Sequence, residues 1–326
     1  MPQTLARMKL NINEETKRKA VWECAVSWSW LLQFAREHHN QLQSLTTSQV
    51  VTQIVIPATK EKAVRYVDFI PSDCVSTPTY FISHTWGSPF LDLIRSLKAF
   101  IPYSETDPIS KTTFVWLDIF AVNQITTSTE QSSDLKSLHR AIQEATKGTL
   151  VCLDLNCKLL TRFFSSILTK SNMFRIWCLF EIWHTFLMSA DRLVVATDIV
   201  DFEKWQKVFV DCNVGDADAT VKADRDRILN EIKQKISLDT MNKNIKHALV
   251  ESARLELERA ETSFSDSITI SFLCHKYARV LNFLGKYDES LPILQRAYDL
   301  IHMQPGREGE VAEILNNMGI KRGVFL

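Results

Sequence analysis

From residue 79 onward, short apolar segments alternate along the chain with amphipathic segments of helical length. Nearly continuous apolar strands that alternate with amphipathic helices are typical of a parallel sheet covered by helices on both faces. We therefore expect an α/β fold in this part of the chain. The expected strands lie at 79–83, 113–119, 149–155 and 192–197, with helices between them at about 89–101, 131–147 and 172–189.

The segment before this alternation predicts an extension of the sheet domain. A helix is expected over 13–45, because Asn13 and two glutamates stand where a helix begins and an aromatic face follows. Residues 50–57 and 63–71 are β-branched or aromatic, and each run ends in proline. These two runs predict strands that could pair as an edge hairpin.

The composition changes after the middle of the chain. All eight tryptophans lie before residue 231, the last at Trp205, and the remainder is rich in charged residues, leucine and isoleucine. Charges of alternating sign past residue 205 indicate solvated or paired helices. We expect an N-terminal helix and hairpin extension (1–75), an α/β domain (76–212), a helical linker (213–262) and a region of helical repeats (263–326).

The last of these regions shows a repeat. Residues 271–301 predict two helices joined at Gly285-Lys286-Tyr287, and residues 312–319 resemble the start of the first helix. Cys274 corresponds to Leu315, a spacing of 41 residues. Helix pairs that recur at such a period predict a superhelical repeat, here with its last unit truncated.

The charge balance disfavours two classes of partner. Lysine and arginine together number 38, as do aspartate and glutamate, so the chain has no net field to attract nucleic acid or an acidic membrane. The most apolar stretch near the start, 25–35, is too short to span a bilayer. We therefore expect neither a nucleic-acid nor a membrane partner.

Cysteine and glycine usage limits the compartment and the cofactors. The seven cysteines show no spacing of zinc ligands or of a disulfide framework, which indicates reduced thiols, a cytoplasmic protein and no metal site. Asp216 and Asp218 lack the glycine and glutamate spacing of a calcium loop. With eight glycines and neither a GxGxxG nor a P-loop motif, no bound dinucleotide cofactor is expected.

Polar residues follow two of the expected strands at the point where each strand ends. His84, Thr85 and Trp86 follow the first strand, and Asn123 and Gln124 follow the second. In parallel sheets, ligands bind beyond the carboxyl ends of the strands. We therefore expect these five side chains on one ligand-binding rim.

The residues around the end of the first strand could cradle a nucleotide. Trp86 could stack on a ring, and Gly87 would let the backbone approach the ligand, beside Ser83 and Thr85. In the alternative interpretation, Ser83 and Gly87 shape the turn and Trp86 caps the core. His84 is either a ligand-binding or a hydrogen-bonded structural histidine.

One carboxylate, Glu181, stands in an otherwise apolar, tryptophan-rich helix. An unpaired charge there would cost several kcal/mol or hold a proton, so Glu181 is a candidate functional residue. Its alternative role is to pair with Arg175 or His84, which would lower its pKa, whereas an apolar pocket would raise it. Trp177 either borders that pocket or packs in the core. Asp118 either binds a ribose hydroxyl or caps the next turn.

Three blocks in this order resemble a TIR domain, of the Toll/interleukin-1 receptor type. TYFISHTWG at 79–87 and FVWLDIFAVNQ at 114–124 resemble its first two strands, TLVCLDL resembles its third, and RIWCLFE at 175–181 resembles its WCxxE helix motif. The resemblance covers roughly residues 78–200 and implies a TIR/flavodoxin-like parallel sheet. The C-terminal helices resemble tetratricopeptide repeats of the kinesin-light-chain type, which implies protein partners bound through these helices.

Many TIR domains cleave NAD at the nicotinamide–ribose bond, and the resemblance implies that Glu181 is the catalytic carboxylate, with NAD as substrate rather than cofactor. Departure of nicotinamide leaves an oxocarbenium-like sugar, which a nearby carboxylate stabilises. The leading hypothesis is a cytosolic signalling protein whose α/β domain cleaves or binds NAD-type nucleotides when assembly through the repeats brings copies together. A homo-oligomer through the TIR-like domain is a further expected partner.

Two other functions remain open. The segment AVNQITTSTEQ and Arg175 depart from the pattern of the family. These departures motivate the alternative of a non-catalytic adaptor, in which the sheet domain and the repeats bind proteins. A nucleoside-processing enzyme of similar sheet topology is a third hypothesis.

Overall fold

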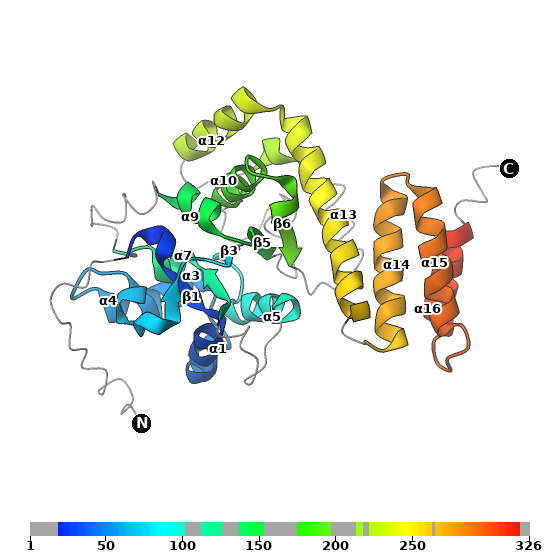
Figure 1. The fold of residues 1–326 in the computed structure, drawn as a ribbon, viewed down its shortest axis with the longest axis horizontal. Helices are drawn as coiled ribbons and strands as arrows, with labels where there is room; N and C mark the ends of the chain where they lie inside the picture. Colours follow the sequence, from blue (N-terminus) through cyan, green and yellow to red (C-terminus); the bar gives the residue numbers. More distant parts are fainter. Residues whose placement is uncertain are drawn as a thin grey trace. The chain divides into compact units, whose positions relative to one another are not determined.

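A computed structural model describes residues 19–101, 112–125, 137–152, 175–196, 213–217, 222–262 and 265–319. The chain divides into two compact units: Met1–Asp198 with Ala217–Glu231, and Ile199–Asp216 with Ile232–Leu326. The first unit holds a sheet with flanking helices, and the described part of the second is helical (Figure 1). This α/β then all-α layout agrees with the sequence prediction.

The first unit is built on a six-stranded mixed sheet with the order β2-β1-β4-β3-β5-β6. Its four parallel strands each fall within a range predicted from the sequence: β3 (Tyr80–Ser83), β4 (Phe114–Trp116), β5 (Thr149–Cys152) and β6 (Leu193–Ala196). The prediction of a wholly parallel sheet was wrong at one edge. There β1 (Ala25–Ser27) pairs antiparallel with β4, and β2 (Val75–Ser76) pairs antiparallel with β1.

The helix predicted over 13–45 is shorter than expected, because β1 interrupts it. Residues 13–18 lie outside the described part of the chain. After the short η2 (Val21–Glu23) and β1, the helices α1 (Trp28–Glu37) and α2 (His39–Leu42) follow. Ser27 ends the strand and caps α1, since its hydroxyl accepts a hydrogen bond from Trp30 N at 3.2 Å.

The segment predicted as a strand at 50–57 is helical, and the edge hairpin is therefore wrong. The run consists of α3 (Thr47–Val50), the π-helical η3 (Val51–Val55) and α4 (Ile56–Thr59). Its buried residues Val51, Val55 and Thr59 recur every four positions, which places them on one helical face. Thr46 and Gln49 form a capping box that starts the run. The second predicted strand contains a single 3₁₀ turn, η4 (Tyr66–Phe69), followed by η5 (Ser72–Cys74).

Helices cover both faces of the sheet. On one face, the ring of Tyr80 lies 5.8 Å from that of Phe100 in α5 (Phe90–Phe100), measured between centroids. On the other face, Thr149 Oγ1 lies 2.6 Å from Thr185 Oγ1 in α10 (Arg175–Phe186). Phe81 pairs with Thr149, so the two side chains lie on the same face of the sheet. Tyr80 is the neighbour of Phe81 along the strand and therefore points to the opposite face. α1 lies beside α5, and α9 (Leu138–Glu144) beside α10 (Figure 1).

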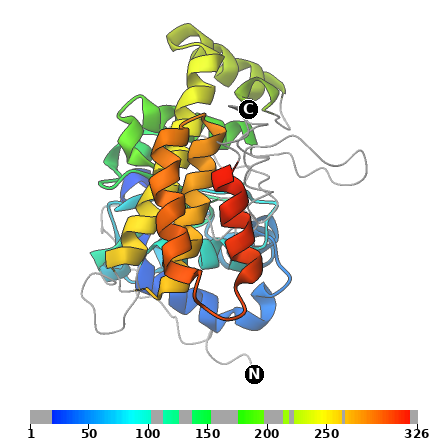
Figure 2. The same cartoon turned by 90° about the vertical axis from the view of Figure 1, so that its right-hand side faces the viewer.

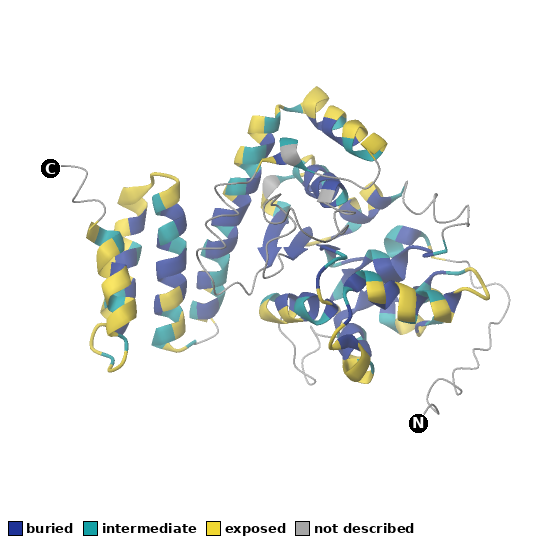
Figure 3. Ribbon diagram, turned by 180° about the vertical axis from the view of Figure 1, so that it is seen from behind, coloured by how far each residue is buried: buried dark blue, intermediate teal, exposed yellow. Residues whose placement is uncertain are grey.

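The parallel strands are buried along almost their whole length (Figure 3). Phe81 and Trp116 are fully buried and stack at 4.8 Å between ring centroids. The indole Nε1 of Trp116 donates to the carbonyl oxygen of Val21 at 2.8 Å, so burial leaves this polar atom satisfied. Trp116 thereby ties the parallel core to the N-terminal segment.

The second unit is a row of helices joined in chain order: α13 (Leu238–Thr262), α14 (Ser267–Phe283), α15 (Tyr287–Ile301) and α16 (Glu308–Gly319). Figure 2 shows α14, α15 and α16 side by side. α12 (Lys222–Lys235) precedes them in the chain, and its residues up to Glu231 belong to the first unit and the rest to the second. The helices predicted within 271–301 and at 312–319 are therefore present.

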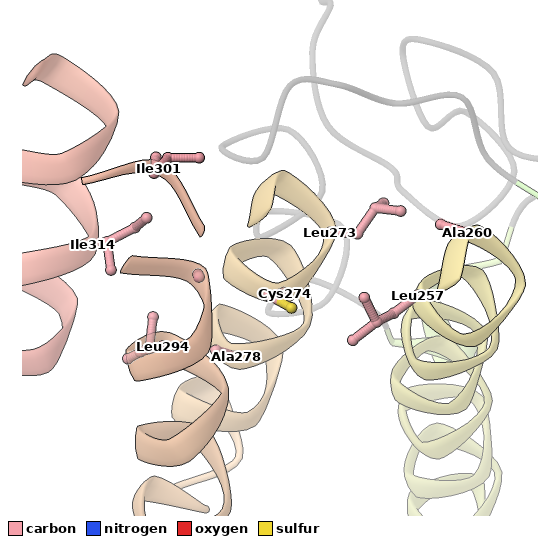
Figure 4. Packing of buried hydrophobic residues seen from close by; sticks show 9 residues of the cluster. Leu257, Ala260, Leu273, Cys274, Ala278, Leu294, Ile301 and Ile314 are labelled. Carbon is pink, nitrogen blue, oxygen red and sulfur yellow. The ribbon is translucent and has the colours of Figure 1, made fainter. Parts of the chain in front are cut away.

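The core of the helical row comes from four helices (Figure 4). Leu257 and Leu273 join α13 to α14, and Leu294 and Ile314 extend the core to α15 and α16. A buried hydrogen bond from Ser271 Oγ to the carbonyl oxygen of Ala297, 2.7 Å long, links α14 to α15. Small residues such as Ala278 and Ala297 are fully buried, which allows the helices to pack closely.

Candidate active site

The site lies at the carboxyl edge of the parallel strands, where β3 and β5 are neighbours. The chain leaves β3 toward α5 on one face of the sheet and enters α10 after β5 on the other. In open α/β sheets, ligands bind where the connections diverge in this way. A hollow of about 10 Å³, room for about one water molecule, lies at this point. Its described lining residues are His84, Thr85, Ser88, Asp92, Leu93, Ser96 and Cys152.

Glu181 reaches this region from α10 and is buried, with 8% of its surface exposed. Its Oε2 has no hydrogen-bond partner in the described part of the chain. Burial raises the pKa of Glu181 well above its ordinary value, and the nearby Asp118 carboxylate raises it further, while the Ser83 hydroxyl lowers it in part. Neither Ser83 Oγ nor Glu181 Oε2 makes a hydrogen bond of ordinary geometry within the described residues. Glu181 therefore stays protonated beyond the usual pH range of a glutamate.

The structural alternative for Glu181 required a charged partner. Among the described residues, no ion pair joins Glu181 to His84, whose Nε2 instead faces Asp118 Oδ1 at 4.0 Å. The side chain of Arg175 lies outside the described part of the structure. The raised pKa agrees with the pocket alternative rather than with pairing.

His84, Trp86 and Asp118 meet at the ends of β3 and β4. The indole Nε1 of Trp86 donates to Asp118 Oδ2 at 2.7 Å. Burial lowers the pKa of His84, and the Asp118 charge opposes this effect. Burial likewise raises the pKa of Asp118, although a quarter of this side chain is exposed. Burial thus favours the neutral form of both groups.

Five buried polar atoms around this edge have no hydrogen-bond partner in the described residues. They are Ser83 Oγ, His84 Nε2, Thr85 Oγ1, Asp118 Oδ1 and Glu181 Oε2. Most buried polar groups in folded proteins are hydrogen-bonded, because leaving one unpaired costs about 1–3 kcal/mol. Their gathering at one edge of the sheet is the expected property of a ligand-binding site.

α10 presents two different faces. Cys178 Sγ donates to the carbonyl oxygen of His84 at 3.4 Å, and Thr185 contacts Thr149, so this face holds the helix on the sheet. Burial raises the pKa of Cys178 well above its ordinary value, which keeps the thiol from acting as a nucleophile.

Trp177 and His184 lie on the other side of α10, against Phe180. The guanidinium carbon of Arg227 in α12 lies 5.6 Å from the centroid of the Trp177 ring. Trp177 is therefore half-buried beneath an arginine. The sequence predicted that it would either border the pocket or pack in the core.

The remaining predicted rim residues divide into two groups. Asn123 Nδ2 donates to the carbonyl oxygen of Ala63 at 2.6 Å, and Gln124 Nε2 donates to that of Asp118 at 2.9 Å, so both amides hold loops together. Trp86 and Gly87 are half-buried in the turn after β3. The carbonyl oxygen of Trp86 accepts a hydrogen bond from Ser48 N at 2.9 Å, which anchors this turn to α3.

Five residues of the hollow were missed from the sequence: Ser88, Asp92, Leu93, Ser96 and Cys152. Cys152 ends β5, and the rule that ligands bind at carboxyl ends of strands would have found it. Asp92 and Ser96 are four residues apart on α5, and Ser96 is fully buried. A polar pair at helical spacing on the apolar face of an amphipathic helix is the signal that could have identified them.

Replacing Thr185 by valine is expected to lower the free energy of unfolding by about 1–2 kcal/mol. Valine keeps the shape but removes the hydrogen bond between Thr185 and Thr149 and leaves the buried Thr149 hydroxyl unpaired. Chemical denaturation would measure the loss. Thr52→Val, at an exposed position, is the matched control and should change stability little; equal stability of both variants would contradict the role of the threonine pair.

A second hollow lies within the helical unit, between α14 and α16. Its volume is about 300 Å³, and its described lining includes Ile268, Phe272, His275, Arg307 and Ile314. Phe272 is 42% exposed, and Leu315 on α16 is 48% exposed. This volume is near the lower limit of small-ligand pockets, and the lining is mostly apolar.

No family model, no curated protein and no solved structure matches this chain. Within the described ranges, no group of three or more histidine, cysteine or acidic side chains could hold a metal ion. No described helix is both long enough and apolar enough to cross a membrane. The functional argument therefore depends on the geometry of the site.

Proposed function

We propose that the protein is a cytoplasmic TIR-like signalling protein that cleaves NAD at the nicotinamide–ribose bond. The observation that carries this proposal is the buried Glu181 carboxyl, whose Oε2 has no partner among the described residues, near buried atoms of Ser83, His84 and Asp118 that likewise have none there. The four parallel strands are arranged second–first–third–fourth in chain order. This is the order of flavodoxin-like sheets, which the resemblance to TIR domains leads us to expect.

The protonation state of Glu181 fits this chemistry. In NAD the nicotinamide ring carries a positive charge while it is attached to ribose. A cation close to Glu181 favours the carboxylate and lowers the pKa that burial has raised. The carboxylate would then form next to the sugar on which positive charge develops as nicotinamide leaves. Substrate binding itself thereby creates the charged form of the catalytic group.

The test is to incubate the purified full chain with NAD over a range of protein concentrations and to measure free nicotinamide. Release whose specific rate rises with protein concentration is expected if assembly activates the domain. Absence of nicotinamide at the highest concentration, in a sample that self-associates by light scattering, would contradict NAD cleavage.

A non-catalytic adaptor is the second candidate, and the hollow between α14 and α16 favours it. Its exposed Phe272 and apolar lining suit an apolar side chain of a bound peptide, as the resemblance to tetratricopeptide repeats implies. In this function the helical unit selects a protein partner and the sheet unit serves as a second contact surface. Self-association without nicotinamide release would favour this candidate.

A further inference from the structure

The pair formed by His84 and Asp118 has a geometry that the proposed role of Glu181 does not use. His84 Nε2 and Asp118 Oδ1 face one another at 4.0 Å, which is too far for a direct hydrogen bond. Both atoms are buried, and neither has a partner in the described part of the chain. The pair is thus held close without being satisfied.

A hydrogen bond to the second carboxyl oxygen of Asp118, Oδ2, fixes the orientation of this side chain. Trp86 Nε1 donates to Oδ2 at 2.7 Å, which leaves Oδ1 directed to His84. On the histidine side, 94% of the residue's surface is buried, so its ring has little freedom to turn toward solvent. The 4.0 Å separation is therefore a property of two constrained groups rather than of two mobile surface side chains.

One oxygen atom fits between the two groups. If an oxygen lay about 2.8 Å from both His84 Nε2 and Asp118 Oδ1, the angle between the two contacts at that oxygen would be roughly 90°. This angle is acceptable for a hydroxyl or a water. The other ring nitrogen of His84 donates to the carbonyl oxygen of Ile82, so Nε2 of the neutral ring is an acceptor, to which a hydroxyl can donate its proton. The oxygen of the same hydroxyl can accept from Asp118 Oδ1, because burial favours the protonated form of that carboxyl. An ionised phosphate oxygen has no proton to donate to His84 Nε2, so this position disfavours it.

We propose that His84 and Asp118 bind one hydroxyl group of the ligand between them, and that Trp86 acts as the positioning residue for Asp118. This inference rests on the proposed function for the identity of that hydroxyl, which is one of the two on the ribose attached to nicotinamide. It adds that the sugar, rather than a phosphate, occupies the carboxyl end of β3. The pair then places the ribose beside Glu181.

The test measures binding by calorimetry, with the full chain and three probes. The probes are nicotinamide riboside, its 2′-deoxy analogue and its 3′-deoxy analogue. The wild-type protein is expected to bind one of the two deoxy analogues about 10–100-fold more weakly than the parent, because that analogue leaves two buried polar atoms unpaired. In Asp118→Ala and His84→Phe, this ratio should fall to within about threefold.

The variants separate recognition from folding. Asparagine keeps an amide oxygen that can accept from Trp86 and an N–H that can donate to the hydroxyl, so Asp118→Asn should keep the ratio that Asp118→Ala loses. Asp73→Asn, an exposed aspartate in the same unit, is the matched control and should keep the wild-type ratio.

Each outcome decides between the inference and the function on which it rests. If the difference in affinity between the parent probe and a deoxy analogue depends on His84 and Asp118 but NAD is not cleaved, the inference is supported and the proposed function is overturned. NAD cleavage with a ratio that neither variant changes overturns the inference alone. Equal binding of all three probes also overturns it, since a water molecule then occupies the position. Absence of both binding and cleavage overturns both.

Discussion

Glu181→Gln is expected to lower the rate of nicotinamide release at saturating NAD by about 10²–10³-fold, the usual cost of removing one group that stabilises charge in a transition state. Glutamine keeps the shape and the hydrogen-bonding carbonyl of the side chain but cannot ionise. Burial raises the pKa of Glu181, so the resting residue is already close to neutral and the substitution changes little before substrate binds. The larger loss should therefore fall on the rate constant, with a smaller rise in KM from the lost attraction between the carboxylate and the nicotinamide cation. Rates and KM values from a nicotinamide assay would separate the two.

The stability of the same variant provides an independent check. A folded-state pKa raised above the unfolded value means that the folded chain holds a proton which the unfolded chain releases. Wild-type stability should therefore fall as the pH rises from the ordinary pKa of a glutamate toward the raised folded pKa. Glu181→Gln should remove this dependence and be at least as stable as the wild type at pH 8.

Glu144→Gln is the matched control for both measurements, because Glu144 lies on α9 and pairs only loosely with Arg140 at 3.4 Å. It should retain activity and the wild-type dependence of stability on pH. An unfolded Glu181→Gln protein, or one that releases nicotinamide at the wild-type rate, would remove Glu181 from the mechanism.

The parallel strands could be predicted because each is a short apolar run flanked by polar turns. Fully buried residues such as Phe81 and Leu150 make both faces of a strand apolar, which is the pattern of a sheet covered by helices. The burial of Glu181 could be predicted for a related reason, since most of the residues around it in α10 are apolar or aromatic. In these segments local sequence and tertiary burial favour the same structure.

The N-terminal edge could not be predicted, because its local signals conflict. The many valines of this segment favour a strand by their intrinsic propensity. However, Val51 and Val55 are buried four residues apart, which is a helical spacing, and they follow the capping box formed by Thr46 and Gln49. β1 is only three residues long and follows an aromatic pattern that also suits a helix. Its pairing with β4 depends on residues almost 90 positions away, such as Val115 opposite Val26. No local pattern carries that information.

The limits of prediction at the site have the same origin. The sequence placed His84 and Asp118 at neighbouring strand ends, but the bond from Trp86 to Asp118 depends on the fold of the turn. The sequence also left open whether Trp177 borders the pocket, and its contact with Arg227 comes from α12, 50 residues later. Side-chain direction around a helix end thus depends on which distant element packs there.

Acidification from pH 7 to pH 4 is expected to destabilise the helical unit by about 3 kcal/mol through His275. Burial, with a smaller effect of Arg279, lowers the pKa of His275 from 6.5 to about 4. Because the folded pKa lies below the unfolded one, the unfolded chain binds a proton that the folded chain excludes. Stability is therefore complete above about pH 6.5 and is lost as the pH falls toward 4.

The hydrogen bonds of His275 support this direction independently. Asn317 Nδ2 lies 2.9 Å from His275 Nε2 and also donates to the carbonyl oxygen of Glu313 at 2.9 Å. A carbonyl oxygen can only accept, so this atom of Asn317 is the amide nitrogen, and Nε2 of the ring must accept from it. Protonation would place a hydrogen on Nε2 and break the bond that joins α14 to α16.

His275→Gln is the variant that tests this prediction, because its side-chain oxygen can still accept from Asn317 but does not titrate in this range. Its unfolding free energy should depend much less on pH between 4 and 7 than that of the wild type. His184→Gln is the matched control: burial lowers the pKa of His184 to about 4 as well, but this residue lies in the sheet unit. Amide hydrogen exchange at pH 4.5 and pH 7 would show which unit each histidine affects.

The same protonation should affect what the helical unit binds. His275, Phe272 and Ile314 line the hollow between α14 and α16, and the bond between His275 and Asn317 fixes the distance between those helices. A peptide bound in the hollow should therefore dissociate over the pH range in which the wild type, but not His275→Gln, loses stability. Acid-induced dissociation that is equal in both proteins would assign the pH dependence to groups other than His275.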